Sequence, residues 1–190
     1  GAVGAARENA RSVRDAISGD VFESLNGAYL TLTRGLMAAA SPGPSMHRVI
    51  ERLMVVNGAI EWTMTRDEGH WFLLLGRSLE RIDMTSRLLD VHHEVLWPDT
   101  GPIATLRSAA GLTPFLRTGE PPTGDAVRRF LVLEPTFPRS LLHSARGAEE
   151  AARGLQSQGN AADATLLREV GLMRSRLEFA GLVQDPSEVD

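Results

Sequence analysis

TRDEGHWFLLLGRSLERIDMTSRLLDVHHEVLW, residues 65–97, is the stretch that decides the fold, because it has the pattern of one long helix. Thr65 followed three residues later by Glu68 is a capping-box pattern, which specifies a helix start. No proline interrupts the stretch before Pro98, which ends it. The sequence therefore predicts a central helix over residues 66–97, about 45 Å long at 1.5 Å per residue.

The apolar residues of this stretch lie on more than one side of the predicted helix. One group shares a face of the helical wheel: Phe72, Leu75, Leu79 and Ile82. A second group lies well away from that face: Leu73, Met84, Leu88 and Val91. A helix that is apolar on several sides is normally surrounded by other helices. We therefore expect the other helices to enclose this one.

Two polar stripes nevertheless run along the same helix. The first comprises Gly76, Glu80, Asp83, Arg87 and Asp90, and the second comprises Arg77, Arg81 and Thr85. Charges on an enclosed helix must be paired, or must face a cleft where a ligand pairs them. The stripes therefore raise two alternatives, a structural network and a binding cleft.

In the structural alternative, Asp83 and Arg87 form an i,i+4 pair, and Glu80 reaches an arginine of a neighbouring helix. The candidate partners are Arg7, Arg11 and Arg139. Such a network can fix the register of the helices without doing chemistry. In the functional alternative, Glu80, Asp83 and the arginines bind a charged peptide or amino acid, and Gly76 leaves room for it. The residues alone favour the structural alternative, because ion-pair networks are common without catalysis.

The rest of the chain also has helical patterns, separated by proline and glycine breaks. Helices are expected over residues 5–18, stopped by Gly19, over 20–40 and 44–64, and in several segments after Pro102. No alternation typical of β-strands persists anywhere. The prediction is an all-α bundle of seven or eight helices in a single domain, residues 1–183, followed by an acidic tail, residues 184–190.

Composition excludes several classes of function. The net charge is −4, so no attraction to nucleic acid or to an anionic membrane is expected. All 20 basic residues are arginine and there is no cysteine, which excludes a lysine nucleophile, a P-loop and thiol chemistry. No phosphate-binding loop, HExxH motif or Glu-x-x-His pair occurs, so neither a cofactor nor a metal site is expected. We expect a cytoplasmic protein, since no signal peptide or membrane-spanning apolar run is seen.

Three segments together resemble the bacterial alpha-E domain, a helical domain of unknown function named for its Glu-Arg motif. They are ARENARSVRD, which includes Arg7, Asn9 and Arg11, then FLLLGRSLERIDMTSRLLD with Glu80 and Arg81, and FPRSLLHSAR with Arg139. Alpha-E domains have a further N-terminal portion with its own Glu-Arg segment, and a single such segment, Glu80–Arg81, is expected here. The resemblance therefore implies that the chain lacks that N-terminal portion, roughly a third of the domain. Exposed apolar surface and self-association, giving a homo-oligomer, would then be expected.

The same resemblance implies a context of peptide ligation. Alpha-E domains are associated with circularly permuted ATP-grasp ligases and occur beside transglutaminase-like proteases, so proteins of both kinds are expected partners. The leading hypothesis is an accessory domain that holds a peptide or amino-acid substrate, or docks the ligase. Its binding candidates are Arg77, Glu80, Arg81, Asp83, Arg87, Arg7, Asn9, Arg11 and Arg139. The alternatives are an enzyme that acts on amides with Glu80 as general acid or base, and a purely structural oligomerisation bundle.

Overall fold

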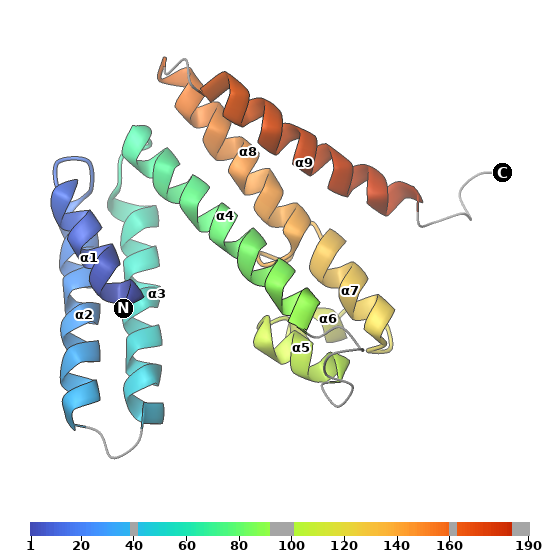
Figure 1. The fold of residues 1–190 in the computed structure, drawn as a ribbon, viewed down its shortest axis with the longest axis horizontal. Helices are drawn as coiled ribbons and strands as arrows, with labels where there is room; N and C mark the ends of the chain where they lie inside the picture. Colours follow the sequence, from blue (N-terminus) through green and yellow to red (C-terminus); the bar gives the residue numbers. More distant parts are fainter. Residues whose placement is uncertain (39–41, 92–100, 160–162, 184–190) are drawn as a thin grey trace. The chain divides into compact units, whose positions relative to one another are not determined.

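The computed structural model describes residues 1–38, 42–91, 101–159 and 163–183. These residues form nine α-helices and no strand, which confirms the all-α class and adds one helix to the predicted number (Figure 1). The chain divides into two compact units, Gly1–His70 and Trp71–Asp190, each described by itself below.

The first unit consists of α1 (Ala2–Ser12), α2 (Gly19–Ala38) and α3 (Pro42–Thr63), and α2 packs against both of the others. Val21, Leu25 and Ala28 of α2 are buried. The helix expected over residues 5–18 ends at Ser12, and Gly19 begins α2 instead of stopping α1. The start of α2 has a local cause. The Ser18 hydroxyl accepts a hydrogen bond from the backbone N–H of Val21 at 3.3 Å, which caps the beginning of that helix.

The long helix α4 (Glu68–Val91) begins two residues later than predicted. The Asp67 carboxylate accepts the backbone N–H of His70 at 3.4 Å, so Asp67 takes the capping position that the Thr65–Glu68 pattern had indicated. His92, His93 and Trp97 lie outside the described residues. The described part of α4 has 24 residues and is therefore about 36 Å long.

The second unit packs α4 against α8 (Leu141–Ser157) and α9 (Asp163–Val183), and residues of all three helices share one buried cluster (Figure 1). The surface of α8 at this contact is made of small residues. Its buried members are Ala148, Ala151, Ala152 and Gly154. A β-carbon added at Gly154 would lie 2.2 Å from Cδ2 of Trp71, so glycine at this position lets the indole of α4 sit directly on the α8 backbone.

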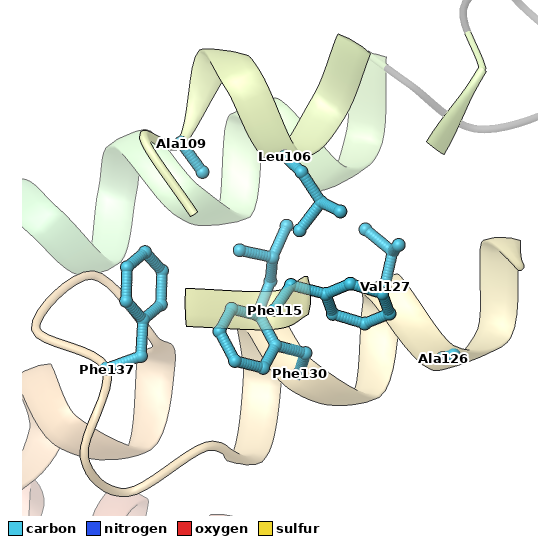
Figure 2. Close-up of a cluster of buried hydrophobic side chains, with 8 residues drawn as sticks. Leu106, Ala109, Phe115, Ala126, Val127, Phe130 and Phe137 are labelled. Atoms are coloured by element: carbon cyan, nitrogen blue, oxygen red, sulfur yellow. The ribbon is translucent and has the colours of Figure 1, made fainter. Parts of the chain in front are cut away.

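Three short helices, α5 (Pro102–Ser108), α6 (Leu112–Leu116) and α7 (Gly124–Leu133), build a second core beyond the end of α4. Figure 2 shows its aromatic rings gathered between these helices. The ring of Phe130 meets Phe115 edge-on at 5.4 Å and stacks on Phe137 at 5.0 Å. Leu88 and Leu89 of α4 pack against the same cluster, which fixes the short helices to the long one.

Candidate functional site

One side of α4 is exposed to solvent. We call this surface the open face; its members are Phe72, Leu73, Gly76, Leu79, Glu80, Asp83, Met84, Arg87 and Asp90. On a helical wheel these nine residues occupy one continuous arc, and the buried residues Leu75, Ser78 and Thr85 lie outside it. The enclosure that the sequence predicts for Glu80, Asp83 and Arg87 is therefore wrong.

The Asp83–Arg87 pair forms as predicted, but on the surface. Arg87 Nε lies 2.8 Å from Asp83 Oδ2, and the two side chains are 76% and 54% exposed. The hydrogen bond to Asp83 raises the pKa of Arg87, and the charge of Glu80 adds to the shift. An exposed i,i+4 pair of this kind adds little to the stability of a helix, because water screens the two charges. This stripe is a solvated ion-pair surface, not a buried network that fixes helix register.

The second stripe, Arg77, Arg81 and Thr85, faces the interior of the protein. Thr85 is buried, and Arg77 and Arg81 are partly buried. The Thr85 hydroxyl donates a hydrogen bond of 2.9 Å to the backbone carbonyl of Arg139, 54 residues away in sequence. The two adjacent residues of the Glu-Arg motif are thus divided, with Glu80 exposed and Arg81 partly buried. The Thr85–Arg139 bond also joins two of the three segments that carry the family resemblance.

The remaining candidates from the N-terminal segment lie in the first unit, and their described contacts stay within it. Arg7 donates to the Asn26 side chain at 2.7 Å and lies over the Tyr29 ring at 5.0 Å. Arg11 is exposed and lies 3.6 Å from Glu8. Asn9 is exposed as well. Arg7 is therefore a packing residue of α1 on α2, and Asn9 and Arg11 belong to a solvated surface.

Arg139 belongs to a hydrogen-bonded loop, residues 134–140, between α7 and α8. Ser140 is fully buried; its hydroxyl donates to the Glu134 carbonyl at 2.6 Å and accepts the N–H of His143 at 3.0 Å. The His143 ring nitrogen Nδ1 lies 3.0 Å from the Pro135 carbonyl oxygen. With the Thr85 bond, these contacts tie the loop to α4 and α8. Ser140 is the N-cap of α8, and a serine at a helix start is a signal that the sequence already carries.

This loop forms one wall of a cavity of 610 Å³. The cavity is lined by Ala110, Pro114, Arg117, Thr118, Phe130, Glu134, Thr136, Phe137, Pro138 and Arg139. A smaller cavity of 190 Å³ adjoins it and shares Thr118, Phe130 and Glu134 with it. The pair of cavities combines an aromatic floor with charged groups, a composition that residue spacing alone did not reveal.

A third cavity, of 420 Å³, lies between α4, α8 and α9. Its apolar lining includes Ile82 of α4, Leu141 of α8, and Leu172, Met173 and Leu177 of α9. By the helical wheel, Leu79 of the open face lies next to Ile82 and Ser86, so the open face borders this groove.

Within the described ranges, there is no group of three acidic or histidine side chains that could hold a metal ion.

The sequence contains a second Glu-Arg dipeptide, Glu51–Arg52 on α3, so the expectation of a single Glu-Arg segment is wrong. Both residues are exposed, and Glu51 lies 3.4 Å from the ring of His47. Of the two dipeptides, only Glu80–Arg81 has one member turned toward protein. A search for the dipeptide would have found both, but only the fold distinguishes them.

Comparison with known protein families agrees with the alpha-E resemblance of the three segments. A family model described as a predicted alpha-helical domain with a conserved ER motif, Alpha-E, matches residues 1–188. No curated protein matches the chain, and no solved structure does. None of the described helices has both the length and the apolar character needed to cross a membrane. Since the match extends over nearly all of the sequence, the chain belongs to the Alpha-E family.

Proposed function

We propose that this Alpha-E chain is an accessory helical domain of a peptide ligation or modification system, and that it docks a partner ATP-grasp ligase through the open face of α4. The observation that carries the proposal is the composition of that face. Four large apolar side chains are at least 36% exposed on it: Phe72, Leu73, Leu79 and Met84. They stand among Glu80, Asp83, Arg87 and Asp90, so apolar anchors and charges share one surface.

Mixed surfaces of this kind suit a protein partner better than a small enclosed substrate. On the helical wheel the charged residues run between two apolar pairs, Phe72 with Leu79 and Leu73 with Met84. Exposed apolar residues beside charges are typical of interaction sites. Three carboxylates against one guanidinium leave the open face with a formal charge of −2, which favours a basic partner surface. The neighbouring groove of 420 Å³ offers a place for an apolar side chain of the partner.

The test is binding of a purified ATP-grasp ligase from the same organism to this protein, measured by biolayer interferometry. We expect the double variant Glu80→Lys/Asp83→Lys, and separately Met84→Glu, to weaken binding about tenfold or more, equivalent to about 1.4 kcal/mol. All three positions are exposed, so the variants should fold, and circular dichroism melting checks that they do. Asp125→Lys on α7 is the matched control, because its side chain is 95% exposed and lies outside the open face.

Unchanged affinity in both open-face variants would reject this surface as the docking site. A transglutaminase-like protein, the other partner implied by the family, is tested in the same assay. If Met84→Glu instead breaks up a homo-oligomer in analytical ultracentrifugation and no ligase binds, the oligomerisation alternative replaces the proposal. Turnover of a peptide amide by this protein alone, abolished in Glu80→Gln, would favour the enzyme alternative and contradict an accessory role.

A further inference from the structure

We propose that the 610 Å³ cavity beside the loop of residues 134–140 binds a small carboxylate with an apolar body, such as an N-acylated hydrophobic amino acid. The cavity shares no residue with the open face, so this inference does not depend on the docking proposal. Its volume lies within the range of about 300–1,000 Å³ that is usual for small-molecule sites. Three features of the cavity carry the inference: its floor, its charges and its hydrogen-bonded backbone.

The floor is apolar and already ordered. Phe130 and Phe137 are 7% and 6% exposed, and their rings stack at 5.0 Å (Figure 2). Pro114 and Pro138 also line the cavity. Such a surface accepts an aromatic or aliphatic group without ordering further side chains, which lowers the entropic cost of binding.

The charges of the lining favour an anion. The lining includes two guanidinium groups, those of Arg117 and Arg139, and one carboxylate, that of Glu134. Glu134 Oε1 already accepts the backbone N–H of Thr136 at 3.0 Å and the hydroxyl of the same residue. Among the described residues, neither Arg117 nor Arg139 forms an ion pair. Two guanidinium groups with planar donor sets therefore remain for a carboxylate ligand.

The backbone around the cavity is hydrogen-bonded, and at one point it is strained. Ala110, which lines the cavity, has φ +53°, a left-handed conformation that usually requires glycine. The N–H of Gly111 bonds the Leu106 carbonyl at 2.7 Å, and the N–H of Ala110 bonds that of Arg107 at 3.0 Å, the two bonds of a Schellman motif. Glycine occupies the next position, 111, and not the left-handed position 110. An added β-carbon at Gly111 would lie 3.1 Å from Cζ of Phe137, which is a tight contact. Backbone outliers of this kind concentrate at ligand sites.

Hydrogen bonds also hold the loop that carries Arg139. Ser140 and Thr85 fix the loop that carries Arg139 through bonds of 2.6 Å and 2.9 Å. Arg117 follows α6 directly, as its C-cap. Both guanidinium groups are thus attached to ordered backbone, which a preformed anion site requires.

The test is an NMR titration of the whole chain with N-acetylphenylalanine, compared with its uncharged amide and with acetate. We expect chemical-shift changes at Thr136, Phe137 and Arg139, and affinity about tenfold or more higher for N-acetylphenylalanine than for either comparison compound. Arg117→Gln and Arg139→Gln should each weaken binding about fivefold or more, since each removes a charge-assisted contact. Arg128→Gln on α7 is the control, as an exposed arginine that lines neither cavity.

Circular dichroism melting of each variant checks that the fold is intact. Equal binding of the amide would show that the guanidinium groups do not select a carboxylate, and equal binding of acetate would show that the aromatic floor contributes nothing. Either result overturns the inference, as does an equal loss of affinity in Arg128→Gln or the absence of saturable binding.

Discussion

Gly154→Ala should destabilise the second unit, although alanine is the better helix former. The added β-carbon would lie 2.2, 2.4 and 2.7 Å from Cδ2, Cε2 and Cγ of Trp71. Carbon atoms in contact normally stay about 3.5–4.0 Å apart. These ring atoms lie near the base of the indole, so no rotation of a distal group relieves the clash. Either the indole leaves its place or α4 and α8 move apart.

The size of the effect follows from two opposing contributions. Alanine in place of glycine inside a helix stabilises by about 1 kcal/mol. Overpacking of a tight contact costs about 1–3 kcal/mol, and exposing an indole that is now partly buried adds to this cost. A cost near 3 kcal/mol therefore leaves a net loss of about 2 kcal/mol. For a chain of this size that loss corresponds to a melting temperature lower by about 4–8 °C.

The measurement is thermal melting followed by circular dichroism, with urea denaturation as a second readout. Gly76→Ala is the matched control, because it makes the same change inside α4 where nothing lies within 4 Å of the new β-carbon. The control should gain stability, up to about 1 kcal/mol. If Gly154→Ala is as stable as Gly76→Ala, the close contact of α4 with α8 does not exist as described.

Three further predictions concern the loop, the strained alanine and the α8–α9 ion pairs. Ala110→Gly should stabilise the chain by about 1 kcal/mol by relieving the left-handed conformation, and a lower melting temperature would contradict this. Thr85→Val should cost about 1 kcal/mol or more, because the Arg139 carbonyl loses its donor, whereas Thr85→Ser should keep the bond; equal melting of the two variants would count against it. Glu149, whose pKa is lowered first of all by its hydrogen bond to Arg174, contributes stability that is present above its unfolded pKa and is lost as the pH falls through the lower folded pKa. The melting temperature should therefore fall in acid below about pH 4.5, and less steeply in Glu149→Gln; parallel pH profiles would refute the assignment.

The sequence alone predicts much of this protein correctly, because the signals concerned are local. Helical periodicity, proline breaks and the absence of strand patterns determine the all-α class. The Asp83–Arg87 pair follows from i,i+4 spacing on any helix. Helix boundaries were less certain, since Thr65 and Asp67 both offer capping side chains and only the backbone selects between them.

The orientation of α4 was decided only by tertiary structure. The helix carries apolar residues on several sides, so its pattern does not reveal which side is buried. The buried side of α4 is determined by α8, whose alanine and glycine residues allow the two helices to approach closely. The opposite side of α4, which carries Glu80, is left in solvent. The cavity beside Arg139 likewise depends on contacts between distant segments, such as the bond from Thr85 across 54 residues. Local propensity determines where the helices form, but which surfaces meet depends on shape complementarity, and that exists only once the chain has folded.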